Sequence, residues 1–216
     1  MGVIVEQFPL YMQGLWGTIQ ICVFAAIGSL VVGTILAGFR VSPVPPLRAV
    51  GAAWVTVFRN TPLAVVLFAF AFGLPEIGIN GQYFWFGVAG LTVYTSAFVC
   101  EAVRSGINSV SAGQAEAARA VGLTFSQSLS FIVLPQALRT VVPPLGSVII
   151  AMIKNSAIVG AFGVGGDLFS VGTQLTSAQG YAAVGALTGV LLGYLILTIP
   201  AGLLLGVLER KVAVAR

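Results

Sequence analysis

Residues 111–139 read SAGQAEAARAVGLTFSQSLSFIVLPQALR, a polar stretch between long apolar segments of a chain that is 58% hydrophobic and only 7% charged. The tetrapeptides at 111–114 and 124–127 both have the S/T-x-x-Q spacing of a helix N-terminal capping box. Gly122 lies between them, where a helix can end in a left-handed residue. The segment therefore predicts two short capped helices, the second reaching Pro135, on the water side of a membrane.

The composition indicates that the rest of the chain is embedded in a bilayer. The mean hydropathy is +1.04, and soluble domains are about 25% charged. The apolar residues run continuously rather than alternating, which favours spanning helices over a barrel. The chain has no histidine, and Cys22 and Cys100 are isolated in apolar stretches. We therefore expect an all-α membrane protein with no metal site and no cofactor of its own.

Five apolar stretches are long enough to span, since a spanning helix needs about 20 residues. They are residues 14–39, 52–74, 84–104, 144–163 and 182–208. The first begins too deep and runs too long for a cleavable signal peptide. The sequence thus predicts one transmembrane domain over 1–216 with five helices, in which residues 105–139 form the largest polar connection.

The distribution of charge predicts the orientation of this bundle. The cations flank the connections on one side: Arg40, Arg48, Arg59, Arg104, Arg119, Arg139, Arg210, Lys211 and Arg216. The other side carries Glu6, Glu76 and Asp167 without Lys or Arg. By the positive-inside rule the N-terminus is outside, and both the C-terminus and 105–139 are cytoplasmic. The net charge of +4 then reflects topology, and we expect no nucleic-acid partner.

A lysine inside the fourth predicted span is a candidate functional residue. If Pro143 and Pro144 start that helix, Lys154 lies ten residues further on, about 15 Å along it and near the midplane. A lysine at that depth usually faces an interior or a water-filled path. It is either a substrate-path residue or a structural lysine paired with carbonyls or a partner's acid.

Four further polar residues join Lys154 as candidates for the path. Asn155 and Ser156 follow it directly in the sequence. Arg59 and Thr61, at the start of the second predicted span, are weaker candidates. Arg59 can equally be a cytoplasmic anchor of topology.

Several motifs identify a family resemblance. EAARAVG at 116–122 followed by LPQA at 134–137 resembles the EAA motif of bacterial ABC importer permeases. Further matches are GLWGTIQ at 14–20, FRNTPL at 58–63, EAVRSGINSVSAGQAEAARAVG at 101–122 and KNSAIVGAFGVG at 154–165. RVSPV at 40–44 and YTSAFVCEAVRSGIN at 94–108 are most similar to glutamate-type polar amino acid permeases. The sequence departs from many members at Asn155-Ser156, where they have an acidic residue or Thr before Thr or Ser.

The resemblance implies a type I ABC importer permease fold in the bacterial plasma (inner) membrane. The ATPase-coupling residues would be Gln114, Glu116, Ala117, Ala118, Arg119, Gly122 and Leu123, with docking through Glu116, Ala117 and Ala118. The partners would be an ABC ATPase dimer, a second permease subunit (the same chain or a paralogue), an extracytoplasmic substrate-binding protein and the lipid bilayer. Residues 164–180 are the exposed candidate for contact with the binding protein.

The chain itself is expected not to be an enzyme. Neither lysine, Lys154 or Lys211, follows a glycine as a P-loop lysine does, so ATP and Mg²⁺ would be bound by the partner ATPases. The favoured function is uptake of a polar amino acid, with glutamate first and glutamine, aspartate or a cationic amino acid as alternatives. An ion-coupled carrier or channel, or a membrane anchor, is a further alternative that Lys154 and the docking segment disfavour.

Overall fold

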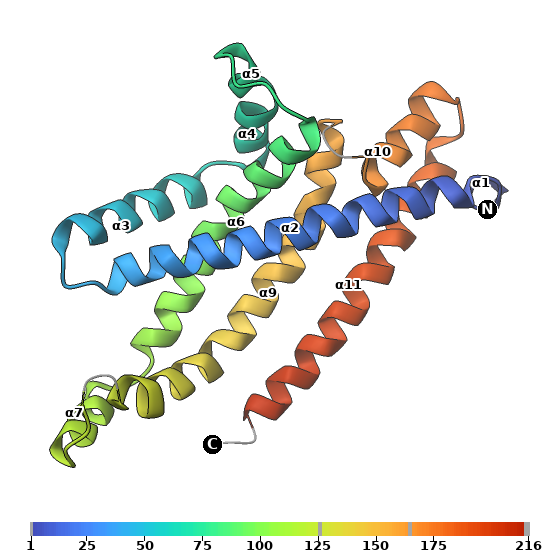
Figure 1. The fold of residues 1–216 in the computed structure, drawn as a ribbon. Helices are drawn as coiled ribbons and strands as arrows, with labels where there is room; N and C mark the ends of the chain where they lie inside the picture. The colour runs from blue at the N-terminus through green and yellow to red at the C-terminus, as the bar shows by residue number, and fades with distance from the viewer. Residues whose placement is uncertain (1, 125–126, 164–165, 214–216) are drawn as a thin grey trace.

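A computed structural model describes residues 2–124, 127–163 and 166–213, and helices are the regular secondary structure of these ranges (Figure 1). Four helices are long and apolar enough to cross a membrane: α2 (Phe8–Val41), α6 (Tyr83–Asn108), α9 (Leu134–Ala161) and α11 (Ala183–Ala213). α6 packs on both α2 and α9, and α9 packs on α11. α2 and α6 pack closely at Gly33, where a side chain would not fit. A Cβ added there would lie only 2.6 Å from Val99. The predicted apolar stretches 14–39 and 84–104 fall within α2 and α6, and 182–208 matches α11 except for its first residue.

The second predicted span, 52–74, is not the continuous helix that we expected. Its residues form α3 (Pro45–Asn60), α4 (Leu63–Phe68), the π-helical η1 (Ala69–Gly73) and α5 (Leu74–Glu76), with a bend of 104° after α3. Pro62 lacks an N–H and holds the preceding residue in an extended conformation. The segments Pro45–Asn60 and Leu63–Glu76 make a fifth span only if the two, bent as they are, are taken together as one broken span.

The fourth span also differs from the prediction. Pro143 and Pro144 lie inside α9, which begins at Leu134 directly after the π-helical η2 (Ser128–Val133). Each proline removes one backbone hydrogen bond, but a long apolar helix packed against neighbours tolerates that loss in a membrane. The expected end of a helix at Pro135 is also wrong. Pro135 occupies the first turn of α9, where a proline is tolerated because that N–H has no partner within the helix.

Three apolar clusters hold the bundle together, and one of them joins α2, α3 and α6 through Leu36, Ala37, Val55 and Cys100. The central cluster joins α2, α4, α6 and α9 through Ile21, Leu67, Leu91, Met152 and Val159. The second cluster joins α2 and α11 to the short helices α10 (Leu168–Thr173) and η3 (Gln174–Ala178) through Tyr11, Leu168, Val171, Leu175, Ala186 and Val190. The N-terminal helix α1 (Gly2–Glu6) packs beside this second cluster.

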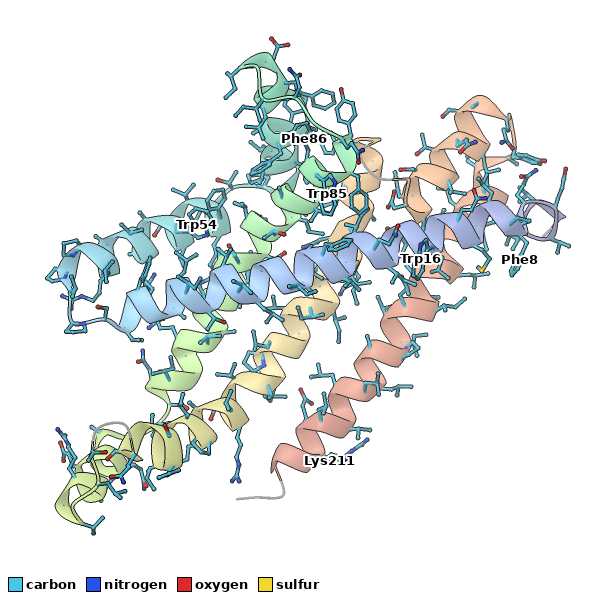
Figure 2. All side chains as sticks on the ribbon, viewed as in Figure 1. Phe8, Trp16, Trp54, Trp85, Phe86 and Lys211 are labelled. Carbon is cyan, nitrogen blue, oxygen red and sulfur yellow. The ribbon has the colours of Figure 1, made fainter. Side chains whose placement is uncertain are left out.

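The two ends of the bundle have different chemistry (Figure 2). We call them the α7 end, which holds α7 (Ala112–Ala120) and the last turn of α11, and the α10 end, which holds α1, α5 and α10. Phe8, Trp16 and Trp85 lie toward the α10 end and Lys211 lies at the α7 end. Trp16 is 61% exposed and Trp85 50% exposed, as expected for aromatic side chains at a membrane interface.

Candidate substrate pocket and coupling bracket

The segment after α6 forms a compact unit at the α7 end, which we call the bracket: α7 and the turn that follows it, to Leu123. Its turn is made at Gly122, whose φ is +88°. The Leu123 N–H donates to Ala118 O at 3.1 Å and the Gly122 N–H donates to Arg119 O at 3.0 Å. This pair of bonds is a Schellman motif, which favours glycine at the left-handed position. The predicted role of Gly122 in ending the helix is confirmed.

Only one of the two predicted capping boxes forms. The Thr124 N–H donates to Gln127 Oε1 at 2.9 Å, and the Gln127 N–H donates to Thr124 Oγ1 at 3.3 Å. Ser111 is the N-cap of α7, but its side chain makes no capping bond. The Gln114 N–H donates to the backbone oxygen of Ser111 at 3.0 Å instead. The predicted start of the helix is right, and the predicted side-chain cap at Ser111 is wrong.

The predicted coupling residues are mostly exposed, with one exception. Gln114, Glu116, Ala117, Arg119 and Gly122 are exposed and Leu123 is half-buried. Ala118 is only 5% exposed, because α7 packs on η2. The expected docking face of Glu116, Ala117 and Ala118 is therefore divided between the surface and the interior of the bracket.

A cavity of about 230 Å³ lies between α6 and α9. Its lining comes from Tyr94, Thr95 and Phe98 on α6 and from Val148, Ala151, Met152 and Asn155 on α9. The α9 residues are spaced i, i+3, i+4 and i+7, which places them on one helix face. Ligand pockets are typically roughly 300–1,000 Å³, so this cavity is sized for a molecule smaller than a drug, held mainly against apolar walls.

The predicted path residues on α9 separate into three positions. Asn155 lines the cavity, and Lys154 beside it is exposed. Ser156 is fully buried and donates to Ile153 O at 2.7 Å, so it faces the core rather than the cavity. Lys154 is seven residues before the end of α9 at Ala161, about 10 Å along the helix. It therefore lies nearer to the α10 end of α9 than to the start of that helix, and its depth in the membrane stays a prediction.

The path residues from the second span lie at its break. Thr61 is half-buried and donates to Val57 O at 2.8 Å, so its hydroxyl serves the end of α3. Arg59 lies in the last turn of α3, not in a connection between spans. Its guanidinium is 5.5 Å from the centre of the Phe98 ring, and Phe98 lines the cavity.

Arg59 belongs to a cluster of four charged residues that sequence reasoning did not predict. Glu101 on α6 accepts two hydrogen bonds from Arg104, at 3.0 and 2.9 Å. Arg40 on α2 and Arg59 on α3 approach the same carboxylate at 3.4 and 3.6 Å. We call these four residues the arginine cluster. Its residues come from three helices, α2, α3 and α6. A local sequence pattern does not show which helices contact each other, so the cluster was not predicted.

The polar residues at the α10 end are less exposed than predicted. Asp167 is fully buried and caps α10, where it accepts from Ser170 Oγ at 2.7 Å and from Tyr194 Oη at 3.2 Å. In the predicted surface segment 164–180, residues 164–165 lie outside the described ranges. Leu168 and Val171 are buried, and residues 177–180 are exposed. Gly166, Thr173 and Gln174 are also exposed, so the described part of the segment alternates between surface and interior.

A bundle of apolar spans with a mainly apolar pocket between two of them and an exposed capped bracket is the arrangement of a membrane permease subunit. The chain belongs to the family described as the binding-protein-dependent transport system inner membrane component, which matches residues 29–214. It is a multi-pass inner-membrane permease and not an enzyme, and ATP hydrolysis belongs to separate ATPase subunits.

Individual relatives match over nearly the whole chain. The probable glutamine ABC transporter permease protein GlnM of Bacillus subtilis is 40% identical over 97% of this chain and 96% of its own. The glutamate transport system permease protein GluC of Corynebacterium efficiens is 42% identical over 96% of both. The crystal structure of an amino acid ABC transporter with histidines superposes with a TM-score of 0.89, 32% identity and 96% coverage of both chains. The fold is that of a type I ABC importer permease, and the chain is a subunit of a polar amino acid importer.

Proposed function

We propose that the cavity between α6 and α9 is the transport site and that glutamate is the preferred substrate, with glutamine as the alternative. The observation that carries this proposal is the charge around the cavity. The Arg59 guanidinium lies 5.5 Å from the centre of the Phe98 ring in its wall, and the exposed Lys154 lies outside the lining, next to Asn155 in the sequence. Glutamate carries two carboxylates and one ammonium group, so its path needs a compensating cation where the dielectric is low. The glutamate permease relative at 42% identity supports the same substrate.

A cationic substrate fits the cavity less well. It would need an acid that is not already neutralised beside the cavity. Glu101, one turn beyond Phe98, is shared by three guanidiniums. The surroundings of the cavity therefore favour an anionic or zwitterionic amino acid.

The test of the substrate is reconstitution of the permease with its ATPase and binding protein in proteoliposomes. Lys154→Met keeps an unbranched apolar stem but removes the charge. We expect uptake of glutamate to collapse while assembly and basal ATP hydrolysis persist. Lys211→Met, at the other lysine of the chain, is the matched control and should transport normally. Full uptake by Lys154→Met would exclude the lysine from the path.

In this proposal the α7 end faces the cytoplasm. Arg119 lies on α7, and Arg210 and Lys211 lie in the last turn of α11, whereas Glu6 and Glu76 lie at the α10 end. A cysteine in place of the exposed Gln127 should be labelled only from the cytoplasmic side. One in place of the exposed Ser177 should be labelled only from outside. The reverse pattern would overturn the orientation.

We further propose the assembly that the family implies, with the chain as a single permease domain. The bracket would dock in an ATPase subunit that binds the ATP and Mg²⁺, so that this chain needs no cofactor. The exposed residues 177–180 would lie on the side of the binding protein. In the most apolar 18 residues of each span, 17% of the residues are buried in the span that contains α9 and 11% in the span of α11, against 61% in that of α6. These open faces support contact with lipid and with a second permease, and copurification of an ATPase and crosslinking across α9 would test it.

A further inference from the structure

The arginine cluster carries more positive charge than its own contacts use. Three guanidiniums surround one carboxylate, which gives a net charge of +2 within the cluster. The side chains of Arg59 and Arg104 are 44% and 30% exposed, and that of Arg40 is 22% exposed. In a membrane-spanning bundle, uncompensated charge is costly and marks a functional position.

The hydrogen bonds show which two guanidiniums are free to bind. Arg104 donates to both carboxylate oxygens of Glu101 in a fork geometry. Arg40 and Arg59 are held at 3.4 and 3.6 Å from that carboxylate, and within the described residues neither donates a hydrogen bond. Each guanidinium has five N–H donors. Both guanidiniums, which share the Glu101 carboxylate, therefore have N–H donors open to an additional acceptor.

The usual structural tasks of arginine near a helix end are performed by other residues here. At the end of α3, Asn60 Nδ2 donates to Thr56 O at 2.7 Å and Thr61 Oγ1 donates to Val57 O at 2.8 Å. At the corner between α2 and α3, Arg48 donates to the carbonyls of Ser42 and Pro43, both at 3.1 Å. Arg59 and Arg40 are thus not needed to satisfy these carbonyls.

The cluster also has a defined position relative to the cavity. Phe98 separates them, with the cavity on one side and the Arg59 guanidinium over its ring. Glu101 follows Phe98 by three residues toward α7, so the cluster lies on the α7 side of the cavity. Arg59 is in the last turn before the break in the second span, and broken spans are where membrane transporters bind polar substrates.

We propose that Arg59 and Arg40 form a second anion station, which receives the α-carboxylate of the amino acid as it leaves the cavity toward the α7 end. This inference rests on the proposed function. The α-carboxylate is assigned because it is common to glutamate and glutamine, and the open N–H donors of a guanidinium match its planar geometry. Glu101 competes for the same guanidiniums and keeps the station weak enough to release its ligand.

The test uses the complete transporter in proteoliposomes and initial rates of glutamate and glutamine uptake. Arg59→Gln should lower both rates by the same factor, roughly tenfold to hundredfold, the range for losing one charge-assisted hydrogen bond. Arg59→Lys should retain part of the rate. Arg48→Gln, which removes an exposed arginine outside the cluster, is the control and should remain within about twofold of wild type.

A double variant separates a binding role from a structural one. Arg59→Gln lowers the net charge of the arginine cluster from +2 to +1, and adding Glu101→Gln restores the net charge to +2. If the station binds substrate, the double variant should transport faster than Arg59→Gln alone. If the ion pair only holds α3 to α6, the double variant should be no better than the worse single variant, and the proposal fails.

Further outcomes of the same experiment test the anion station and separate it from the proposed function. If Arg59→Gln does not assemble with the ATPase, then Arg40→Gln, which removes the same charge from another helix, carries the test. Normal uptake by an assembled Arg40→Gln complex would overturn the station. Loss of glutamate uptake with full glutamine uptake would overturn the assignment to the α-carboxylate. Absence of both uptakes in the wild type would instead refute the proposed function.

Discussion

The two short helices α7 and α10 are held in opposite ways. α7 ends in hydrogen bonds of its own backbone around Gly122, and most of its side chains are exposed. α10 is tied to three spans. The Leu168 N–H donates to Thr18 Oγ1 on α2 at 3.0 Å, Ser170 Oγ donates to Gly160 O on α9 at 3.2 Å, and Tyr194 Oη on α11 donates to Asp167 at 3.2 Å. A helix ordered locally offers its side chains to a partner, whereas one ordered by tertiary bonds is part of the bundle.

The largest expected effect comes from removing the buried carboxylate of α10. Asp167→Ala deletes the N-cap that accepts from the Phe169 and Ser170 N–H groups and removes the carboxylate that accepts from Tyr194 Oη, so we expect a loss of about 3 kcal/mol in stability. Thermal unfolding in detergent would measure it. Gly113→Ala on α7, where a Cβ would meet nothing within 4 Å, is the control and should be neutral. Equal melting temperatures for the two variants would contradict the contrast between α7 and α10.

A smaller effect should separate the two alanines of the bracket. Ala118→Arg inserts a long side chain at a position that is 5% exposed, and overpacking of this kind costs about 1–3 kcal/mol. Ala117→Arg lies at the exposed position next to it and should leave stability unchanged, but it should uncouple ATP hydrolysis from uptake. The ratio of ATP hydrolysed to substrate transported, measured beside thermal stability, checks both. Full coupling in the Ala117 variant would remove that residue from the docking surface.

Substitution at the turn of the bracket should act locally. Gly122→Val forces a β-branched residue into φ +88°, which costs about 1–2 kcal/mol. Among the residues that the structure describes, the hydrogen bonds at that turn are local backbone bonds of α7, so we expect loss of coupling with little change in the unfolding of the spans. A large drop in the melting temperature of the whole permease would show that the bracket is not a local unit.

The smallest effect distinguishes the two helix starts. Thr124→Ala removes a capping bond that is present, and should cost about 1 kcal/mol of local stability. Ser111→Ala removes a side chain that makes no capping bond, and should cost almost nothing. Hydrogen exchange of the amides of α7 for Ser111→Ala and of residues 127–133 for Thr124→Ala would measure the two, and equal loss of protection would contradict the assignment.

Features encoded by neighbouring residues were predictable from the sequence. The spans α2, α6 and α11 follow from hydropathy, and the turn at Gly122 follows from its capping context. The break at Thr61-Pro62 was also encoded, because proline restricts the residue before it. It was missed since the apolar run continues on both sides. The start of α9 was misplaced because a proline pair marks a helix start or an interior bend equally well.

The candidate site was only partly predictable. Asn155 and Arg59 were named from their polarity within apolar stretches, and each lies at or beside the cavity. The aromatic wall of Tyr94 and Phe98 was missed, although the YTSAF run at 94–98 places hydroxyls and a ring within one helical turn. The sharing of Glu101 by three arginines could not be inferred, because it depends on how α2, α3 and α6 cross.

The continuity of α6 has an evolutionary consequence. One uninterrupted helix of 26 residues carries the cavity wall, the arginine cluster and, after its last turn, the bracket. A single-residue insertion between Phe98 and Glu101 would rotate everything beyond it by about 100° and advance it by about 1.5 Å. Both the pairing at Glu101 and the aim of α7 would be lost together. The length of this stretch should therefore be fixed among functional homologues, whereas the loop at 77–82 can gain or lose residues freely.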